Sequence, residues 1–267
     1  MTGRVSGDIP LSVAAIDKVL MPYAEALANR LGVNLLPYAV PEPRRHDNAA
    51  VLLVFGFDGL YLQKTGKKAP GPVMVDWASG KNAHRRRQGG GELVVKAVGA
   101  ARATRPLTVI DATAGLGEDA LVLASHGCHV TMLERSAVMA ELLADGMRRA
   151  AGDPELAPVL ERMRLLGDNA VNWLRDHPEA ADVVYLDPMF PERRQSAEVR
   201  KEMRICRDLV GDDADAGELL EAALAAAGHR VVVKRPRKAE ALPGPSPASS
   251  VVGRSSRFDI YSRRALP

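Results

Sequence analysis

The fold is decided by residues 109–120, which read VIDATAGLGEDA. The apolar run 107–110 predicts a short buried strand, and residues 119–125 predict the start of a helix. Gly115 and Gly117 form the turn between them, because glycine lets the backbone come close to a ligand and lets helix and strand pack tightly. This strand, turn and helix predict the first unit of an α/β sheet with a ligand-binding edge.

The next two predicted strands also end in polar residues. Residues 128–133 lead to Glu134, about 20 residues beyond the glycines, where an acidic residue usually binds the two ribose hydroxyls of an adenosine cofactor. Residues 164–166 lead to Asp168 and Asn169, and either side chain could hydrogen-bond the adenine amino group. The pattern therefore predicts an adenosine cofactor along one edge of the sheet.

The glycine turn alone does not separate two such cofactors. Gly115, Gly117 and Ala120 satisfy the G-x-G-x-x-A pattern of NAD-binding sheets. Asp111, however, precedes the glycines, where it can pair with the cationic amino-acid end of S-adenosylmethionine. We therefore expect S-adenosylmethionine. An NAD-dependent oxidoreductase is the alternative, although this sequence contains no evident Tyr-x-x-x-Lys or His/Asp catalytic pair.

A second motif, DPMF at residues 187–190, follows the apolar run 181–186, where the fourth strand of such a sheet would end. The Asp187 carboxylate can accept hydrogen bonds from a planar amino group. Pro188 fixes the backbone so that the following carbonyls point into the site, and Phe190 offers a face on which a base can stack. The motif predicts methylation of an exocyclic amine on a nucleobase that is single-stranded or flipped out of its helix.

Residues 1–75 predict a small N-terminal α+β subdomain. Residues 12–31 carry helical apolar spacing that is broken by Pro22. Residues 50–55 and 59–63 predict two strands of a hairpin. Loops and a domain boundary are indicated by prolines at positions 37, 41, 43, 70 and 72.

Residues 76–267 predict the larger domain, in which strands and helices alternate as in a doubly wound sheet. Residues 216–227 predict an apolar helix that leads into a fifth strand at 230–233. Residues 251–252 and 258–261 predict a closing antiparallel hairpin. This hairpin favours a methyltransferase sheet, because an NAD-binding sheet more often continues parallel.

Composition excludes several classes of protein. Although 46% of the 267 residues are apolar, no run approaches the length of a membrane span, and charged residues interrupt the N-terminus as they would not in a signal peptide. Cys128 and Cys206 are the only cysteines and form neither a C-x-x-C pair nor a zinc spacing. We expect a cytoplasmic protein with reduced thiols, no metal and no membrane partner.

Basic residues gather in three clusters, although the net charge is only +3. One cluster precedes three consecutive glycines, one follows the DPMF motif, and one follows the strand at 230–233. The side chains predicted to contact RNA phosphates are His84, Arg85, Arg86, Arg193, Arg194, Lys201, Arg204, Lys234 and Arg235.

Seven segments resemble the RsmJ family, namely residues 111–117, 121–125, 132–135, 184–191, 201–204, 231–236 and 257–261. Members of that family are S-adenosylmethionine-dependent methyltransferases that modify the N2 of one guanosine in small-subunit ribosomal RNA. The resemblance implies a Rossmann-like class I methyltransferase sheet of seven strands with the last hairpin antiparallel. It also implies 16S ribosomal RNA, or the small ribosomal subunit, as the partner.

The motifs together define the predicted site. Its catalytic residues are Asp187, Pro188 and Phe190. Its cofactor-binding residues are Asp111, Thr113, Gly115, Gly117, Glu118, Asp119, Glu134, Arg135, Asp168, Asn169 and Asp187. Thr113 departs from the common pattern, because many methyltransferases carry a further glycine there.

Two further functions remain open. The Asp-Pro-x-aromatic turn also serves methylation of adenine N6 in DNA or RNA, or of another amine in RNA or protein, and identifying the modified atom would decide between them. A non-catalytic RNA-binding ribosome-assembly factor with a vestigial cofactor site is the alternative outside the enzymes. A measurable rate of methyl transfer would exclude it.

Overall fold

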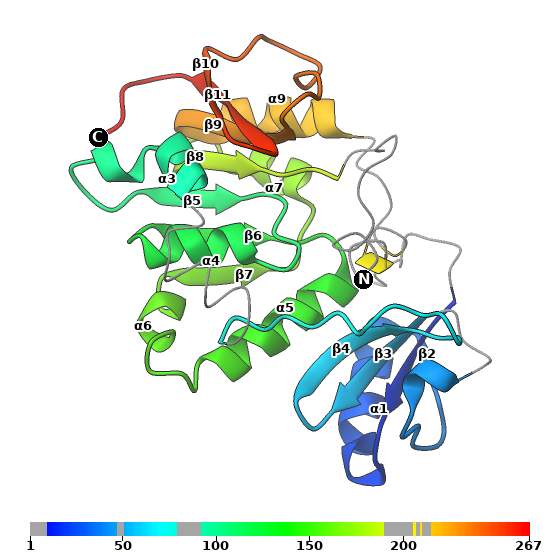
Figure 1. Cartoon of the computed structure of the whole chain (residues 1–267). Helices are drawn as coiled ribbons and strands as arrows, with labels where there is room; N and C mark the ends of the chain where they lie inside the picture. Colours follow the sequence, from blue (N-terminus) through cyan, green and yellow to red (C-terminus); the bar gives the residue numbers. More distant parts are fainter. Residues whose placement is uncertain (1–9, 47–50, 79–91, 190–204, 207–208, 210–214) are drawn as a thin grey trace. The chain divides into compact units, whose positions relative to one another are not determined.

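The structure, a computed structural model of the chain, describes residues 10–46, 51–78, 92–189, 205–206, 209 and 215–267. These residues form two compact units (Figure 1). The first unit takes in the described residues of Met1–Val75, Ser136–Arg149 and Pro191–Asp212, and the second takes in those of Asp76–Arg135, Ala150–Phe190 and Asp213–Pro267. A domain boundary between residues 75 and 76 stays a prediction.

The first unit contains a four-stranded sheet in the order β2-β1-β3-β4. Its strands are β1 (Leu11–Ala15), β2 (Asn34–Leu35), β3 (Val51–Gly56) and β4 (Gly59–Lys64), and a 3-10 helix, η2, spans Pro43–Arg45. β1 pairs in parallel with β2 and β3, whereas β3 and β4 form the predicted antiparallel hairpin. Gly59 starts β4 with a φ of +125°, a conformation that glycine adopts without strain.

The prediction of a helix over residues 12–31 is wrong in its first part. Residues 11–15 form β1, and after a 3-10 turn η1 (Lys18–Leu20) helix α1 spans only Met21–Leu31. Pro22 lies in the first turn of α1, where its missing N–H leaves no helical hydrogen bond unmade. The proline therefore begins this helix. A short apolar run that is covered on both faces cannot be assigned to helix or strand by periodicity alone.

Helix α5 (Ala137–Ala150) is fastened to the first unit by a buried carboxylate. Asp145 accepts a hydrogen bond from the backbone N–H of Leu60 in β4 (3.0 Å) and forms an ion pair with Arg149 (2.8 Å). Arg149 also donates to the carbonyl oxygen of Val75. These contacts explain why a segment far along the chain groups with the N-terminal strands.

The second unit contains a seven-stranded sheet in the order β10-β11-β9-β8-β5-β6-β7. The strands are β5 (Thr108–Asp111), β6 (His129–Leu133), β7 (Met163–Leu166), β8 (Ala181–Leu186), β9 (Ala227–Pro236), β10 (Ser249–Val252) and β11 (Ser256–Ser262). The five neighbouring strands β9, β8, β5, β6 and β7 run parallel to one another. Strand β11 is antiparallel to both β9 and β10. The predicted sheet with its closing antiparallel hairpin is confirmed.

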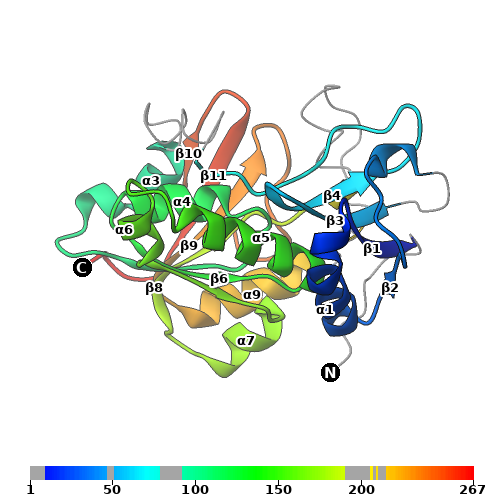
Figure 2. The ribbon, with the colours of Figure 1, turned by 90° about the horizontal axis from the view of Figure 1, so that it is seen from below.

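Helices cover both faces of this sheet (Figure 2). Helices α3 (Glu92–Val98), α4 (Glu118–Ser125) and α6 (Ala157–Leu160) lie on one face, and α7 (Ala170–Asp176) and α9 (Ala216–Ala226) lie on the other. A 3-10 turn, η3 (Ala100–Arg102), follows α3. Because both faces are covered, all six residues of β8 are buried. Among the described helices none is long and apolar enough to cross a membrane.

Candidate cofactor and catalytic site

Three predicted site residues lie at the carboxyl ends of three neighbouring strands. β5 lies between β6 and β8 in the parallel part of the sheet. Asp111 ends β5, Glu134 follows β6, and Asp187 follows β8. The strand order reverses at β5, and open α/β sheets bind their ligands at such a switch point. The structure thus brings these three carboxylates to one edge of the second unit.

The glycine turn closes the gap between β5 and α4. Gly115 and Gly117 have φ values of +54° and +71°, which an L side chain rarely adopts. A Cβ on Gly115 would have its nearest atom at 3.9 Å, so the turn leaves space beside the backbone. The N–H of Gly115 donates to Oε2 of Glu134 (2.9 Å). The acidic residue after β6 therefore orients the turn after β5.

Asp111 is the most deeply buried carboxylate of this edge, with 2% of its surface exposed. The pKa of Asp111 is raised to about 7, and burial is the main cause. The neighbouring Asp119 and Asp187 contribute to the rise, whereas the Thr113 N–H (3.1 Å) and Lys234 oppose it. A buried carboxyl of this kind would gain from a cationic ligand.

Lys234, on β9, joins Asp187 to Asp119, a carboxylate in the first turn of α4. Its Nζ lies 2.7 Å from Oδ2 of Asp119 and 2.8 Å from Oδ2 of Asp187. Burial lowers the pKa of Lys234, but the attraction of Asp187 and Asp119 outweighs it and raises that pKa above its usual range. The hydroxyl of Tyr185, in β8, also donates to Asp119 (2.7 Å). Sequence reasoning placed Lys234 among the RNA contacts and did not foresee this bridge.

Thr113 ties the two predicted motifs together. Its Oγ1 accepts a hydrogen bond from the backbone N–H of Asp187 (2.6 Å). A glycine at this position has no hydroxyl to offer. Threonine in place of the common glycine therefore adds a hydrogen bond between the turn after β5 and the turn after β8. Pro188 is buried beside it, and Met189 is half-buried.

Four other predicted cofactor residues lie in the loops after the strands or at the start of a helix. Asp168 accepts from the N–H of Asn169 (2.7 Å), and Asn169 caps α7 by accepting from the N–H of Asn172 (3.2 Å). Arg135 forms an ion pair with Asp215 (3.2 Å), and Glu118 is exposed in the first turn of α4. Their contacts with a cofactor stay predictions.

Most of the predicted RNA contacts lie outside the described residues. These are His84, Arg85, Arg86, Arg193, Arg194, Lys201 and Arg204, and the catalytic candidate Phe190 lies outside them as well. Arg235 is described. It is 7% exposed, and its Nε donates to the carbonyl of Glu240 (2.9 Å). A phosphate contact at Arg235 or Lys234 stays a prediction.

The chemistry of this edge fits S-adenosylmethionine. The turn at Gly115 leaves space beside a backbone held by Glu134, whose carboxylate suits ribose hydroxyls. The buried Asp111 carboxyl suits the cationic end of the cofactor. No group of three or more His, Cys, Asp or Glu side chains that could hold a metal ion occurs within the part of the chain that the structure describes.

Comparison with known proteins agrees with this geometry. The family model described as "Putative SAM-dependent methyltransferase" matches residues 40–263. The ribosomal RNA small subunit methyltransferase J of Marinobacter nauticus is 53% identical over 247 residues, which cover 91% of this chain and 88% of the relative. The protein of the same name in Pseudomonas aeruginosa is 51% identical over 259 residues and covers 96% of both chains.

A solved structure has the same fold over nearly the whole chain. It is the crystal structure of a SAM-dependent methyltransferase from Neisseria gonorrhoeae. The two structures align with a TM-score of 0.71 at 35% identity, over 94% of this chain and 95% of the other. The architecture of both units is therefore that of a known methyltransferase.

Proposed function

Because this chain belongs to the ribosomal RNA small subunit methyltransferase J family, we propose that it methylates the exocyclic N2 amine of one guanosine in 16S ribosomal RNA, with S-adenosylmethionine as methyl donor. The observation that carries the proposal is the placement of Asp187 after β8, where Thr113 and Lys234 hold it at the cofactor edge. A fixed carboxylate at this point is a suitable acceptor for the hydrogens of a purine amine.

The cofactor would be held by the residues around the glycine turn. Bound S-adenosylmethionine supplies an electrophilic methyl group on a sulfonium. Glu134 would accept hydrogen bonds from the ribose hydroxyls, and Asp111 would pair with the cationic amino group. Asp168 or Asn169 would accept a hydrogen bond from the adenine amino group.

The work of the protein is to aim a weak nucleophile. The lone pair of an exocyclic amine is delocalised into the base, so the reacting nitrogen must be oriented and biased toward tetrahedral geometry. The Asp187 carboxylate and the Pro188 carbonyl would accept the two amine hydrogens for this purpose. Orientation of reacting groups can supply roughly 7–11 kcal/mol of a barrier in favourable cases. Phe190 would stack on a base that has left its helix.

The proposal is tested by methyl transfer from radiolabelled S-adenosylmethionine. The substrates are 16S ribosomal RNA and small subunits from cells that lack the enzyme, and the product is digested to nucleosides. We expect the label in N2-methylguanosine, and we expect Asp187→Ala to lose it even at a saturating concentration of the cofactor. Label in N6-methyladenosine would show that the target is adenine N6 and would refute guanine N2 as the methylated atom. No label on any ribosomal substrate, despite cofactor binding, would refute the proposed substrate.

The isosteric variant Asp187→Asn separates charge from placement. Its amide oxygen can still accept one hydrogen of the amine, whereas the negative charge beside Lys234 is gone. Activity intermediate between the wild type and Asp187→Ala would assign part of the effect to hydrogen bonding. Full activity in both variants would refute the amine-holding role.

A further inference from the structure

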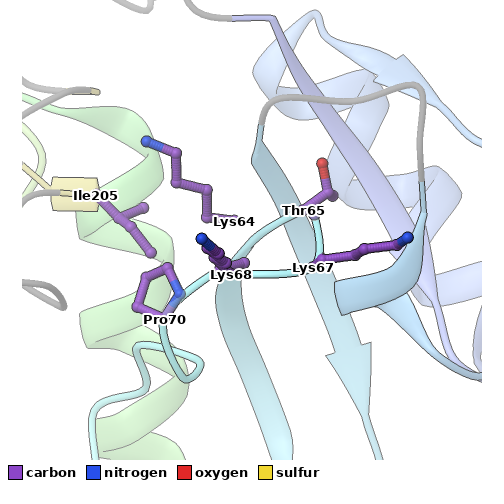
Figure 3. Close-up of a pocket in the computed structure, with 8 residues that line it drawn as sticks. Lys64, Thr65, Lys67, Lys68, Pro70 and Ile205 are labelled. Carbon is purple, nitrogen blue, oxygen red and sulfur yellow. The ribbon is translucent and has the colours of Figure 1, made fainter.

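The first unit carries a pocket of about 350 Å³ with a basic lining. It is formed by residues 64–70, here named the lysine loop, together with Ile205 (Figure 3). The loop contributes three lysines, Lys64, Lys67 and Lys68, and none of the lining residues that the structure describes is acidic. In Figure 3, Lys67 extends away from the other two lysines. The loop therefore presents positive charge over more than one direction.

The lysine loop is held in shape by internal hydrogen bonds. The buried side chain of Gln63 donates through Nε2 to the carbonyls of Lys64 (2.7 Å) and Pro70 (3.1 Å) at the two ends of the loop. Leu62 and Val73 close its base through two reciprocal N–H···O bonds of 2.8 Å. A loop that is ordered before binding loses less conformational entropy when a ligand arrives.

A second basic segment is attached to this loop. The N–H of Gly66 donates to the carbonyl of Arg44 (2.8 Å), in η2. None of Lys67, Lys68 and Arg44 forms an ion pair with any residue that the structure describes. Cations that are not neutralised by neighbouring carboxylates attract a polyanion, and lysine ammonium groups bind phosphate oxygens as point charges.

An exposed aromatic side chain lies on the connection between β2 and β3, which also contains η2. Tyr38 is 54% exposed, and its hydroxyl lies 3.3 Å from Nε2 of His46, which directly follows η2. Surfaces that bind single-stranded nucleic acid combine basic groups that follow the backbone with aromatic faces on which bases stack.

We propose that the lysine loop is a second RNA-binding site, in which Lys67 and Lys68, with Arg44 beside them, bind phosphates of the ribosomal RNA backbone. The identity of the polyanion as ribosomal RNA rests on the proposed function. The site binds backbone and not base edges, so it adds affinity without choosing the target nucleotide. The first unit thereby gains a role that is separate from methyl transfer in the second.

The test compares two double variants that remove the same charge. Lys67→Ala/Lys68→Ala removes two loop cations, and the control Lys18→Ala/Lys96→Ala removes two other exposed lysines, in η1 and α3. Binding to naked 16S ribosomal RNA and to small subunits is measured over a range of salt concentrations. We expect the loop variant to weaken binding to both about tenfold near physiological salt. The slope of log K against log salt should fall by about 1.5 for two lost phosphate contacts.

The control should bind within about twofold of the wild type. Equal effects of the two double variants would overturn the proposal, because only net charge would then matter. Weakened binding to small subunits with unchanged binding to naked RNA would also overturn it, since the loop would then contact a ribosomal protein. Binding is measured without methyl transfer, so a wild type that binds RNA and leaves it unmethylated refutes the proposed function alone.

Discussion

Lys234 holds Asp187, the carboxylate proposed to accept the amine hydrogens, and it also contacts Asp119 in α4. Its Nζ bridges Asp119 and Asp187 within 2.8 Å. In Lys234→Met the two carboxylates would repel each other, and the turn at Asp187 would shift. We expect the rate of methyl transfer at saturating RNA to fall about 100-fold, because displacements near 1 Å can cost that much. Single-turnover measurements with radiolabelled cofactor provide the rate.

Lys238→Met is the matched control for this variant. Lys238 is exposed on the connection after β9, and its replacement removes the same charge. We expect Lys238→Met to keep the saturated rate. If both variants lose rate equally, or if both lose only RNA affinity, the bridge to Asp187 has no part in positioning.

The buried Asp111 makes stability depend on pH. Burial raises the pKa of Asp111 from 3.8 to about 7. Between these two values the folded protein holds a proton that the unfolded chain has released, so this group favours folding at low pH and loses that contribution as pH rises toward 7. Asp111→Asn removes the titration and keeps an acceptor for the Thr113 N–H.

We expect Asp111→Asn to be more stable than the wild type at about pH 8, by an amount on the order of a few kcal/mol, with little difference at about pH 4. Urea unfolding at both pH values measures this. Asp176→Asn, which removes an exposed carboxylate at the end of α7, is the matched control for this substitution. A constant difference between wild type and Asp111→Asn at all pH values would contradict a raised pKa in the folded state.

Between elements, Thr113 links the turn after β5 to the turn after β8. Thr113→Val keeps the shape of the side chain and removes the oxygen that accepts the N–H of Asp187 (2.6 Å). We expect a loss of stability of about 1 kcal/mol and a roughly tenfold lower rate at saturating cofactor and RNA. Thr113→Ser restores the oxygen and should restore the rate. A Ser variant as slow as the Val variant would assign the effect to packing.

In the first unit, Asp145 attaches α5 to β4. It is buried and accepts from Leu60, Arg148 and Arg149. Asp145→Ala would leave a buried N–H and two arginines without their acceptor, and we expect about 3 kcal/mol of destabilisation in urea unfolding. Glu141, also on α5, forms a more exposed ion pair with Arg30 of α1, and Glu141→Ala should cost less than about 1 kcal/mol. If both variants lose a similar free energy of unfolding, the burial of Asp145 does not increase its contribution to stability.

The elements of the second unit could be predicted because each follows from local pattern. The glycine turn, the run 181–186 and the closing hairpin each carry their own signal, and the sheet order confirms them. The sequence did not reveal β1, because four of its five residues are buried and such a short run has no clear helical or strand period. The Lys234 bridge could not be predicted, since its partner Asp119 is 115 residues away and no spacing rule links a cation on one strand to a carboxylate on a distant helix.

For the molecule as a whole, the proposed cofactor site and the contacts of Asp145 lie in different units. The effect of the cofactor on stability can therefore be compared with the effect of Asp145→Ala. Every residue proposed to bind S-adenosylmethionine lies in the second unit, whereas Asp145 stabilises the first. A ligand that binds only the folded state adds about 2.7 kcal/mol at 100 times its Kd. We therefore expect S-adenosylmethionine, and not NAD, to stabilise the wild type against urea.

The pattern of unfolding then shows whether the units fold together. If they unfold in one transition, the cofactor should offset the loss in Asp145→Ala, because a two-state protein sums its contributions. If they unfold separately, the cofactor should shift only the transition of the second unit, and Asp145→Ala only that of the first. In either case Glu134→Gln should lose most of the cofactor effect, because a ribose hydroxyl bonds a neutral amide more weakly than a carboxylate. Stabilisation by NAD, or an undiminished effect in Glu134→Gln, would contradict the proposed cofactor contacts.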